Sequence, residues 1–378
     1  MSLTNADVDA VLQDPLQVAM NSGRPVVLYV SNNVPVELIH ACGCFPLQLP
    51  TAPRADYGRA DRYLEPNFDP MVRAALEQLL AGELDKASLL VLPRTLDAWQ
   101  RLYYYLCELR RSFGESVPEP FLYDLQQLPT EASADYNLVS TELLAKRLQA
   151  LGGVTLTDDA LTGAIEHYNR IRAQLRGLIG RRWKQPSKLR GADALDLYTA
   201  AGRLDADRLE RALDSLLAMR GEAAPGRRVL LVGSPHDSAA VHRAIERAGG
   251  QVVADFHARG DWNLTPDLAL KSSPDRLPSG APLRAVSRHY HERTLSTRSM
   301  ALTTSALTEL ARASAAEVAV FFYYAEEEAL TWDFPAQSEA LAAGGVPSLL
   351  LPQQAYPPTP DLETRVKEFL EHVFGGQP

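Results

Sequence analysis

Residues 25–49 read PVVLYVSNNVPVELIHACGCFPLQL, and this stretch contains the unit from which the fold is built. Residues 26–30 are apolar and mostly β-branched, which predicts a strand buried on both faces. The polar residues 31–33 follow, and Pro35 suits the first turn of a helix because its missing N–H costs nothing there. Residues 45–49 form the next apolar run. This order predicts a parallel β-α-β unit, with a ligand-facing loop after the first strand.

The same alternation of short apolar runs and helical patterns recurs along the chain. Further strands are predicted at 89–92, 118–123, 229–232, 251–254, 317–324 and 347–351. Residues 136–220 show helical spacing only. The sequence therefore predicts an α/β fold with two Rossmann-like (flavodoxin-like) parallel-sheet lobes, joined by a helical section and facing each other across a cleft. The predicted boundaries are 1–135 for the N-terminal α/β lobe, 136–224 for the helical connecting section and 225–378 for the C-terminal α/β lobe.

The composition argues against several classes of protein. The 378 residues carry a formal net charge of −9. Nucleic acid is therefore not expected as a partner, because it needs a basic surface. A membrane partner is not expected either, since no apolar run approaches the roughly 20 residues that span a bilayer. Three cysteines predict a reducing compartment rather than a disulfide framework, and residues 1–17 lack the features of a signal peptide. We therefore expect a cytoplasmic protein.

Four stretches, taken in order, resemble one enzyme family. They are VPVELIHACGCFPLQL (34–49), DPMVRAALEQLLAGELDKASLLVLPRTLDAWQRLY (69–103), RVLLVGSPHDSAAVHRAIERAGGQVVADF (228–256) and VAVFFYYAEEEALTWDFPAQSEALAAGGVPSLLL (318–351). Together they resemble the D-component of 2-hydroxyacyl-CoA dehydratases and the related benzoyl-CoA reductase subunits. The resemblance implies two Rossmann-like lobes, an acyl-CoA ligand and a dimer. If the chain is an enzyme, it implies a lyase or reductase subunit. It also implies a [4Fe–4S] cluster held by three cysteine thiolates between the lobes.

The sequence departs from the family pattern at the cysteines. Where the resemblance implies the first two cluster ligands, this chain has Asp69 and Leu96, and the segment before Trp332 has no cysteine at all. Iron–sulfur clusters need soft thiolate ligands, which aspartate and leucine cannot replace. We therefore expect no [4Fe–4S] cofactor and no metal site in this chain, and we interpret Cys42 and Cys44 as packing residues.

Three residues are candidates for acid–base catalysis. Glu326 and Glu327 follow a predicted buried strand, and adjacent carboxylates can raise one another's pKa. Both are equally compatible with a solvated helix start. His40 lies one helical turn from Glu37, so the pair could act as a catalytic dyad or as a structural helix pair.

A second set of residues is predicted to bind the ligand. These residues lie in turns that follow predicted strands, or near the lost cysteine positions, where capping or solvent exposure is the alternative. They are Ser31, Asn32, Arg73, Arg94, Asp97, Ser234, His236 and Tyr324.

These features predict a 2-hydroxyacyl-CoA dehydratase-like subunit without its own cluster, which binds an acyl-CoA or a similar small carboxylic ligand in the cleft. The expected assembly is a homodimer, or a heterodimer with a cluster-bearing relative. Three alternatives remain open at this point. The chain could be an active subunit with atypical ligands such as Asp69 and Cys44, a non-redox acid–base enzyme, or a scaffold.

Overall fold

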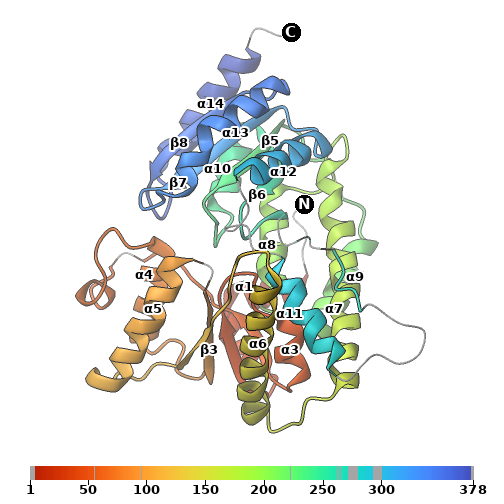
Figure 1. Cartoon of the computed structure of the whole chain (residues 1–378). Coiled ribbons are helices and arrows are strands. Elements are labelled where there is room, and N and C mark those ends of the chain that lie inside the picture. Colours follow the sequence, from red (N-terminus) through yellow and green to blue (C-terminus); the bar gives the residue numbers. More distant parts are fainter. Residues whose placement is uncertain are drawn as a thin grey trace.

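The computed structural model describes residues 5–54, 56–94, 96–221, 223–261, 264, 266–270, 280–292 and 300–375. Two four-stranded sheets, both entirely parallel, confirm the predicted α/β class and the pair of parallel-sheet lobes (Figure 1). None of the described helices is both long enough and apolar enough to cross a membrane.

The two sheets have the same topology. The first contains β1 (Val26–Tyr29), β2 (Phe45–Gln48), β3 (Leu89–Pro93) and β4 (Glu119–Tyr123) in the order β2-β1-β3-β4. The second contains β5 (Arg227–Gly233), β6 (Gly250–Phe256), β7 (Val318–Tyr324) and β8 (Ser348–Gln354) in the order β6-β5-β7-β8. The strand order therefore reverses beside β1 in one lobe and beside β5 in the other. The loops that follow β1, β3, β5 and β7 border these switch points, where open α/β sheets bind ligands.

Helices cover both faces of each sheet, as the continuously apolar strands require. Val26 and Leu28 pack with α4 (Pro70–Leu80) and α5 (Asp97–Glu108), while Val27 and Tyr29 pack on the opposite face. That opposite face is covered by α3 (Val36–Ala41), α6 (Glu131–Gly152), α7 (Asp158–Ile179) and α11 (Ala281–His291). In the second lobe α10 (Ala240–Arg247) and α14 (Asp361–Phe374) cover one face, and α12 (Met300–Ala313) and α13 (Phe334–Ala343) cover the other.

The predicted helical section is present. It consists of α6, α7, α8 (Gly191–Ala201) and α9 (Ala206–Ala218), and the N-terminal helices α1 (Ala6–Gln13) and α2 (Pro15–Met20) pack beside it. Helix α11 was not predicted. Although it lies in the sequence range of the second lobe, it packs against α6 and α7 beside the first sheet (Figure 1). The chain therefore returns to the first lobe before it completes the second.

Candidate functional site between the lobes

A small cavity of about 20 Å³ has walls from both lobes. The first lobe contributes Asp69, Pro70 and Met71 at the start of α4, and the second lobe contributes Ser234, Pro235, Tyr324, Glu326 and Glu327. The last five residues belong to β7 or to the turns that follow β5 and β7. The structure therefore brings together Asp69, where the resemblance implies a cluster ligand, and four of the predicted site residues.

Asp69 has a structural role as well as a place in the cavity wall. One of its carboxylate oxygens, Oδ1, accepts hydrogen bonds from the backbone N–H groups of Met71 at 2.8 Å and Val72 at 3.1 Å, and so caps α4. Pro70 occupies the first helical turn, which is a favoured position for proline. Burial raises the pKa of Asp69 in spite of these two donors.

The two glutamates lie close enough to Asp69 for the charges to interact. Burial raises the pKa of both Glu326 and Glu327, and the negative charge of Asp69 adds to the effect. Glu327 Oε1 also accepts the backbone N–H of Leu330 at 3.0 Å. The next residue, Glu328, is exposed and does not line the cavity. Carboxyl groups of raised pKa can keep a proton closer to neutral pH, and a protonated carboxyl can donate a hydrogen bond.

Ser234 and Tyr324 form part of the cavity wall that the second lobe contributes. The Ser234 hydroxyl accepts the backbone N–H of Tyr324 at 3.1 Å, so it joins the turn after β5 to the end of β7. Tyr324 is buried, and burial raises the pKa of its phenol well above the ordinary value. His236 lies behind this wall, with Nδ1 3.4 Å from the Tyr324 hydroxyl.

The donors around this cavity do not fit an iron–sulfur cluster. They are carboxylates, a hydroxyl, a phenol and the thioether of Met71, and no thiol is among them. Cys42 and Cys44 are buried in the apolar core of the first lobe, where Cys44 Sγ lies 3.8 Å from the Leu148 carbonyl oxygen. Burial raises the pKa of Cys42 to about 12 and that of Cys44 to about 11, which keeps both as thiols at neutral pH. Asp69 and Cys44 therefore do not share a site.

A larger cavity of about 120 Å³ lies beside the carboxyl end of β1. Ser31 and Asn32 line it together with Tyr29, Gly202 and residues of α7 and α8. Ser31 has a φ of 66°, a left-handed conformation that is uncommon for serine and often found at functional sites. Arg259, from the second lobe, completes the wall. Two of the predicted ligand-binding residues of the first lobe, Ser31 and Asn32, thus face a different cavity from Glu326 and Glu327.

The remaining predicted residues line neither cavity. Arg73 pairs with Asp61 at 2.6 Å and Arg94 pairs with Asp124 at 3.2 Å. Asp97 is exposed in the first turn of α5, and Leu96 is 44% exposed.

His40 and Glu37 do not act as a pair. His40 packs edge-on against His167 and Tyr168, with ring centroids 6.1 and 5.9 Å away, and burial lowers its pKa. Glu37 is fully buried, where it pairs with Arg172 and accepts the Tyr290 hydroxyl at 2.7 Å.

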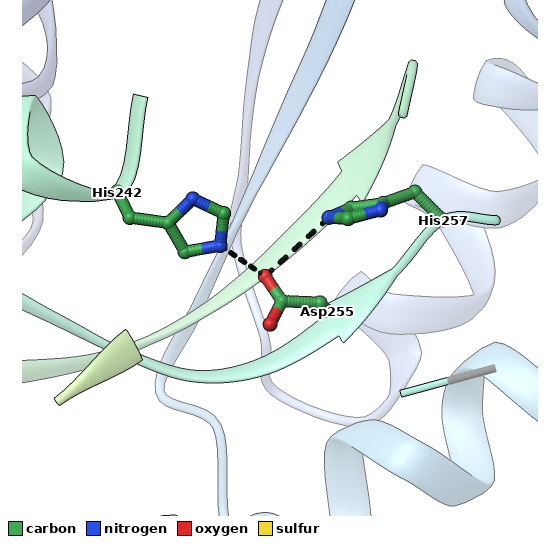
Figure 2. Close-up of side chains that lie close together, drawn as sticks. All are labelled: His242, Asp255 and His257. Carbon is green, nitrogen blue, oxygen red and sulfur yellow. Dashed lines mark hydrogen bonds and ion pairs between the residues drawn. The ribbon is translucent and has the colours of Figure 1, made fainter. Parts of the chain in front are cut away.

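A buried polar cluster that the sequence analysis did not predict lies under the second lobe's site. His242 on α10, Asp255 on β6 and His257 just beyond it point at one another (Figure 2). His242 Nε2 lies 2.6 Å from Asp255 Oδ1, and His257 Nε2 lies 3.6 Å from the same oxygen. Arg182 donates to the other carboxylate oxygen at 2.6 Å. Burial alone would raise the pKa of Asp255, but His242 and Arg182 outweigh it and hold that pKa well below the ordinary range.

The spacing of this cluster would suit a metal ion, but the partners of the two histidines favour a structural role, in which hydrogen bonds and ion pairs brace the second lobe. The backbone N–H of Arg259 points at His257 Nδ1 at 3.3 Å, which assigns the ring proton to Nε2, facing Asp255. His242 likewise needs its proton on Nε2 to bond to Asp255 at 2.6 Å. Metal ligation would require lone pairs on both of these nitrogens. The polar residues Asp255 and His257 at the end of a buried strand were the only sequence signal of this cluster.

Comparison with known proteins decides the family. The sequence profile of the family described as "2-hydroxyglutaryl-CoA dehydratase, D-component" matches residues 31–373. The chain belongs to this family. The match confirms the resemblance carried by the four stretches, and it spans both lobes and the helical section.

Three curated relatives of the dehydratase D-component family are similar to the chain. The YjiM protein of Escherichia coli (strain K12), whose name describes it as a dehydratase subunit, is 28% identical over 63% of this chain and 64% of its own length. A benzoyl-CoA reductase subunit of Thauera aromatica is 25% identical over 61% of each chain. The (R)-phenyllactyl-CoA dehydratase beta subunit of Clostridium sporogenes is 20% identical over 91% of each. The chain thus covers less than two thirds of the first two relatives.

Proposed function

We propose that this chain is a 2-hydroxyacyl-CoA dehydratase-like subunit that holds no iron–sulfur cluster of its own and binds an acyl-CoA, or a related carboxylic ligand, between its lobes. One observation carries the proposal: the cavity between the start of α4 and the loops after β5 and β7 is walled by the carboxyls of Asp69, Glu326 and Glu327 instead of cysteines. The family match and the relatives named for CoA thioesters support the ligand class.

The chemistry of the cavity favours a thioester over a free acid at this end of the ligand. Three carboxyls would repel a bound carboxylate whenever any of them is ionised. A thioester carbonyl is neutral and accepts hydrogen bonds. Because burial raises the pKa values of Glu326 and Glu327, each is protonated more readily than an ordinary glutamate, and a protonated carboxyl can donate a hydrogen bond to that oxygen.

The raised pKa values also favour a second candidate, a non-redox acid–base enzyme that uses Glu326 or Glu327. Such an enzyme would turn over a CoA thioester without iron, and its pH–rate profile would be bell-shaped. The cluster-free binding subunit would show no turnover of its own.

Metal analysis tests the first half of the proposal. We expect the chain, purified without oxygen, to contain neither iron nor acid-labile sulfide in stoichiometric amounts. A full complement of both would refute the cluster-free assignment.

Calorimetry with acetyl-CoA tests the second half. We expect wild-type protein to bind acetyl-CoA more tightly than free CoA, which lacks the thioester carbonyl. The Glu327→Ala variant should bind acetyl-CoA about tenfold more weakly, because one hydrogen bond is lost. The neighbouring Glu328→Ala is the matched control, since Glu328 is exposed, and it should bind as wild type does. Equal affinities for the thioester and for CoA would contradict the proposed ligand.

The assembly is also part of the proposal. We propose that the chain pairs with itself or with a cluster-bearing relative, which the subunit names of its relatives support. Light scattering of the purified chain, alone and co-expressed with such a relative, tests this. A monomer in both experiments would refute it.

A further inference from the structure

Arg203 is a buried cation for which the described part of the chain provides no counter-ion. It follows α8 directly after Gly202 and is only 5% exposed. Its Nε and Nη2 atoms are buried and have no hydrogen-bond partner among the described residues, which also offer it no ion pair. An unpaired guanidinium in this position is costly, because desolvation is not compensated. Burial and the neighbouring Arg259 together lower the pKa of Arg203 to about 10.

Arg259 brings a second guanidinium to the same region from the other lobe. It lies in the turn after β6, and its Nη1 is buried without a hydrogen-bond partner among the described residues. It lines the larger cavity beside Gly202, the residue before Arg203. Burial raises the pKa values of Asp69 and Tyr324, and the charge of Arg259 offsets part of that rise. Arg259 therefore lines the larger cavity and is close enough to Asp69 and Tyr324 in the smaller one for its charge to act on them.

Two carboxylates, Asp69 and Asp237, lie near these arginines. Asp237 is near enough to Arg203 to act on its pKa, but no ion pair joins Asp237 to either arginine in the part of the chain that the structure describes. The Tyr356 hydroxyl donates to one of its carboxylate oxygens. Arg203 also borders an open cavity between α2 and α4, so it is not sealed from a small solute.

The turn that carries Arg259 is held in place by the buried cluster beneath it. His257 Nδ1 accepts the Arg259 N–H, while Arg182 and the Tyr198 hydroxyl both bond to Asp261 on the far side of the turn. A Cβ on Gly260 would lie 2.4 Å from Asp255 Cβ, so only glycine fits there. These contacts fix the position of the turn, although they keep the positive charge of Arg259 close to that of Arg203.

We propose that Arg203 and Arg259 form an oxyanion-binding site in the cleft, which takes a carboxylate or phosphate group. A guanidinium matches both groups bidentately, and an anion between the two arginines would remove their repulsion and compensate their burial. The assignment of this anion to the charged part of the thioester ligand rests on the proposed function, but the site itself does not.

Calorimetry of the full chain with inorganic phosphate and with succinate, at constant ionic strength in chloride, tests the site and separates the two sources. We expect at least one of the two anions to bind and to raise the melting temperature. Arg259→Gln should weaken that binding about tenfold or more, because hydrogen bonds to a charged group are lost. The matched control is Arg211→Gln on an exposed part of α9, which should bind as wild type does.

Arg203→Met provides a second, independent readout. It removes an uncompensated buried charge, so it should raise the melting temperature without anion and abolish the anion-dependent rise. Wild-type binding that survives in both variants, or the absence of any response to either anion in wild type, would overturn the proposal. If wild-type protein does not bind acetyl-CoA but both wild type and Glu327→Ala still bind the anion, the proposed function is refuted and the anion site stands.

Discussion

The buried Arg182–Asp255 pair allows a quantitative prediction. Both side chains are fully buried, Arg182 Nη1 lies 2.6 Å from Asp255 Oδ2, and Asp255 also accepts a hydrogen bond from His242. Breaking one partner of a buried ion pair costs about 3–5 kcal/mol. Asp261 would still partly compensate Arg182, and an asparagine oxygen can still accept one hydrogen bond. Asp255→Asn should therefore lower the free energy of unfolding by about 3 kcal/mol, at the lower end of that range.

Urea denaturation followed by circular dichroism measures this loss as a lower midpoint at an unchanged m-value. The matched control is Asp267→Asn, which removes a surface pair with Arg176 at 2.7 Å, where both side chains are partly exposed. That change should cost no more than about 1 kcal/mol. Equal losses in the two variants would refute the conclusion that the buried cluster braces the second lobe.

The same carboxylate gives a pH dependence with a definite sign. Because its pKa is held well below the ordinary value, the stability that Asp255 contributes is present above its unfolded pKa of about 3.9 and is lost as pH falls through its folded pKa. The difference in stability between wild type and Asp255→Asn should therefore shrink in strong acid. A difference that stays constant down to pH values where wild type unfolds would contradict this.

Two glycines, a buried histidine and the thiols provide three further tests. Gly152→Ala should destabilise the protein by about 1–3 kcal/mol, because the new Cβ would lie 1.9 Å from the Cys42 carbonyl oxygen. Gly163→Ala, whose Cβ would lie in open space on α7, should instead stabilise the protein by about 0.5–1 kcal/mol. Urea denaturation midpoints measure both changes. Burial, with His257 and His242 nearby, lowers the pKa of His236 well below its ordinary value. Because the unfolded chain then binds a proton that the folded protein does not, the free energy of unfolding should fall as pH drops below about 6.5. This fall should be smaller in His236→Gln. In native protein a thiol reagent should modify Cys107 alone, since Cys42 and Cys44 are buried with raised pKa values, and rapid modification of all three thiols would contradict the packing described.

Local patterns were sufficient to predict most of the elements. The strands β1, β3, β5 and β7 are buried on both faces, so their sequences are continuously apolar and can be recognised without knowledge of their neighbours. Helix α11 was missed because its neighbours α6 and α7 lie more than a hundred residues earlier in the chain. Nothing local to a short helix after a long connection indicates on which lobe it will pack.

The candidate site was predicted in part, and the division has a physical cause. Polar turns after buried strands identify residues near a switch point, which is how Ser31, Ser234 and Glu327 were selected. Those turns do not say which cavity each residue faces, because that depends on how the lobes lie together. From the sequence, Arg73 and Arg94 could not be told apart from residues that line a cavity, since their partners Asp61 and Asp124 are set by tertiary contacts.

The sequence by itself determined the parallel β-α-β units and the family, because strand burial and side-chain chemistry are local properties. Only the tertiary structure decided that Asp69 from one lobe meets Glu326 and Glu327 from the other. It alone left Arg203 and Arg259 without counter-ions among the residues it describes. Burial and charge pairing arise between residues distant in the chain, so their energies belong to the folded arrangement.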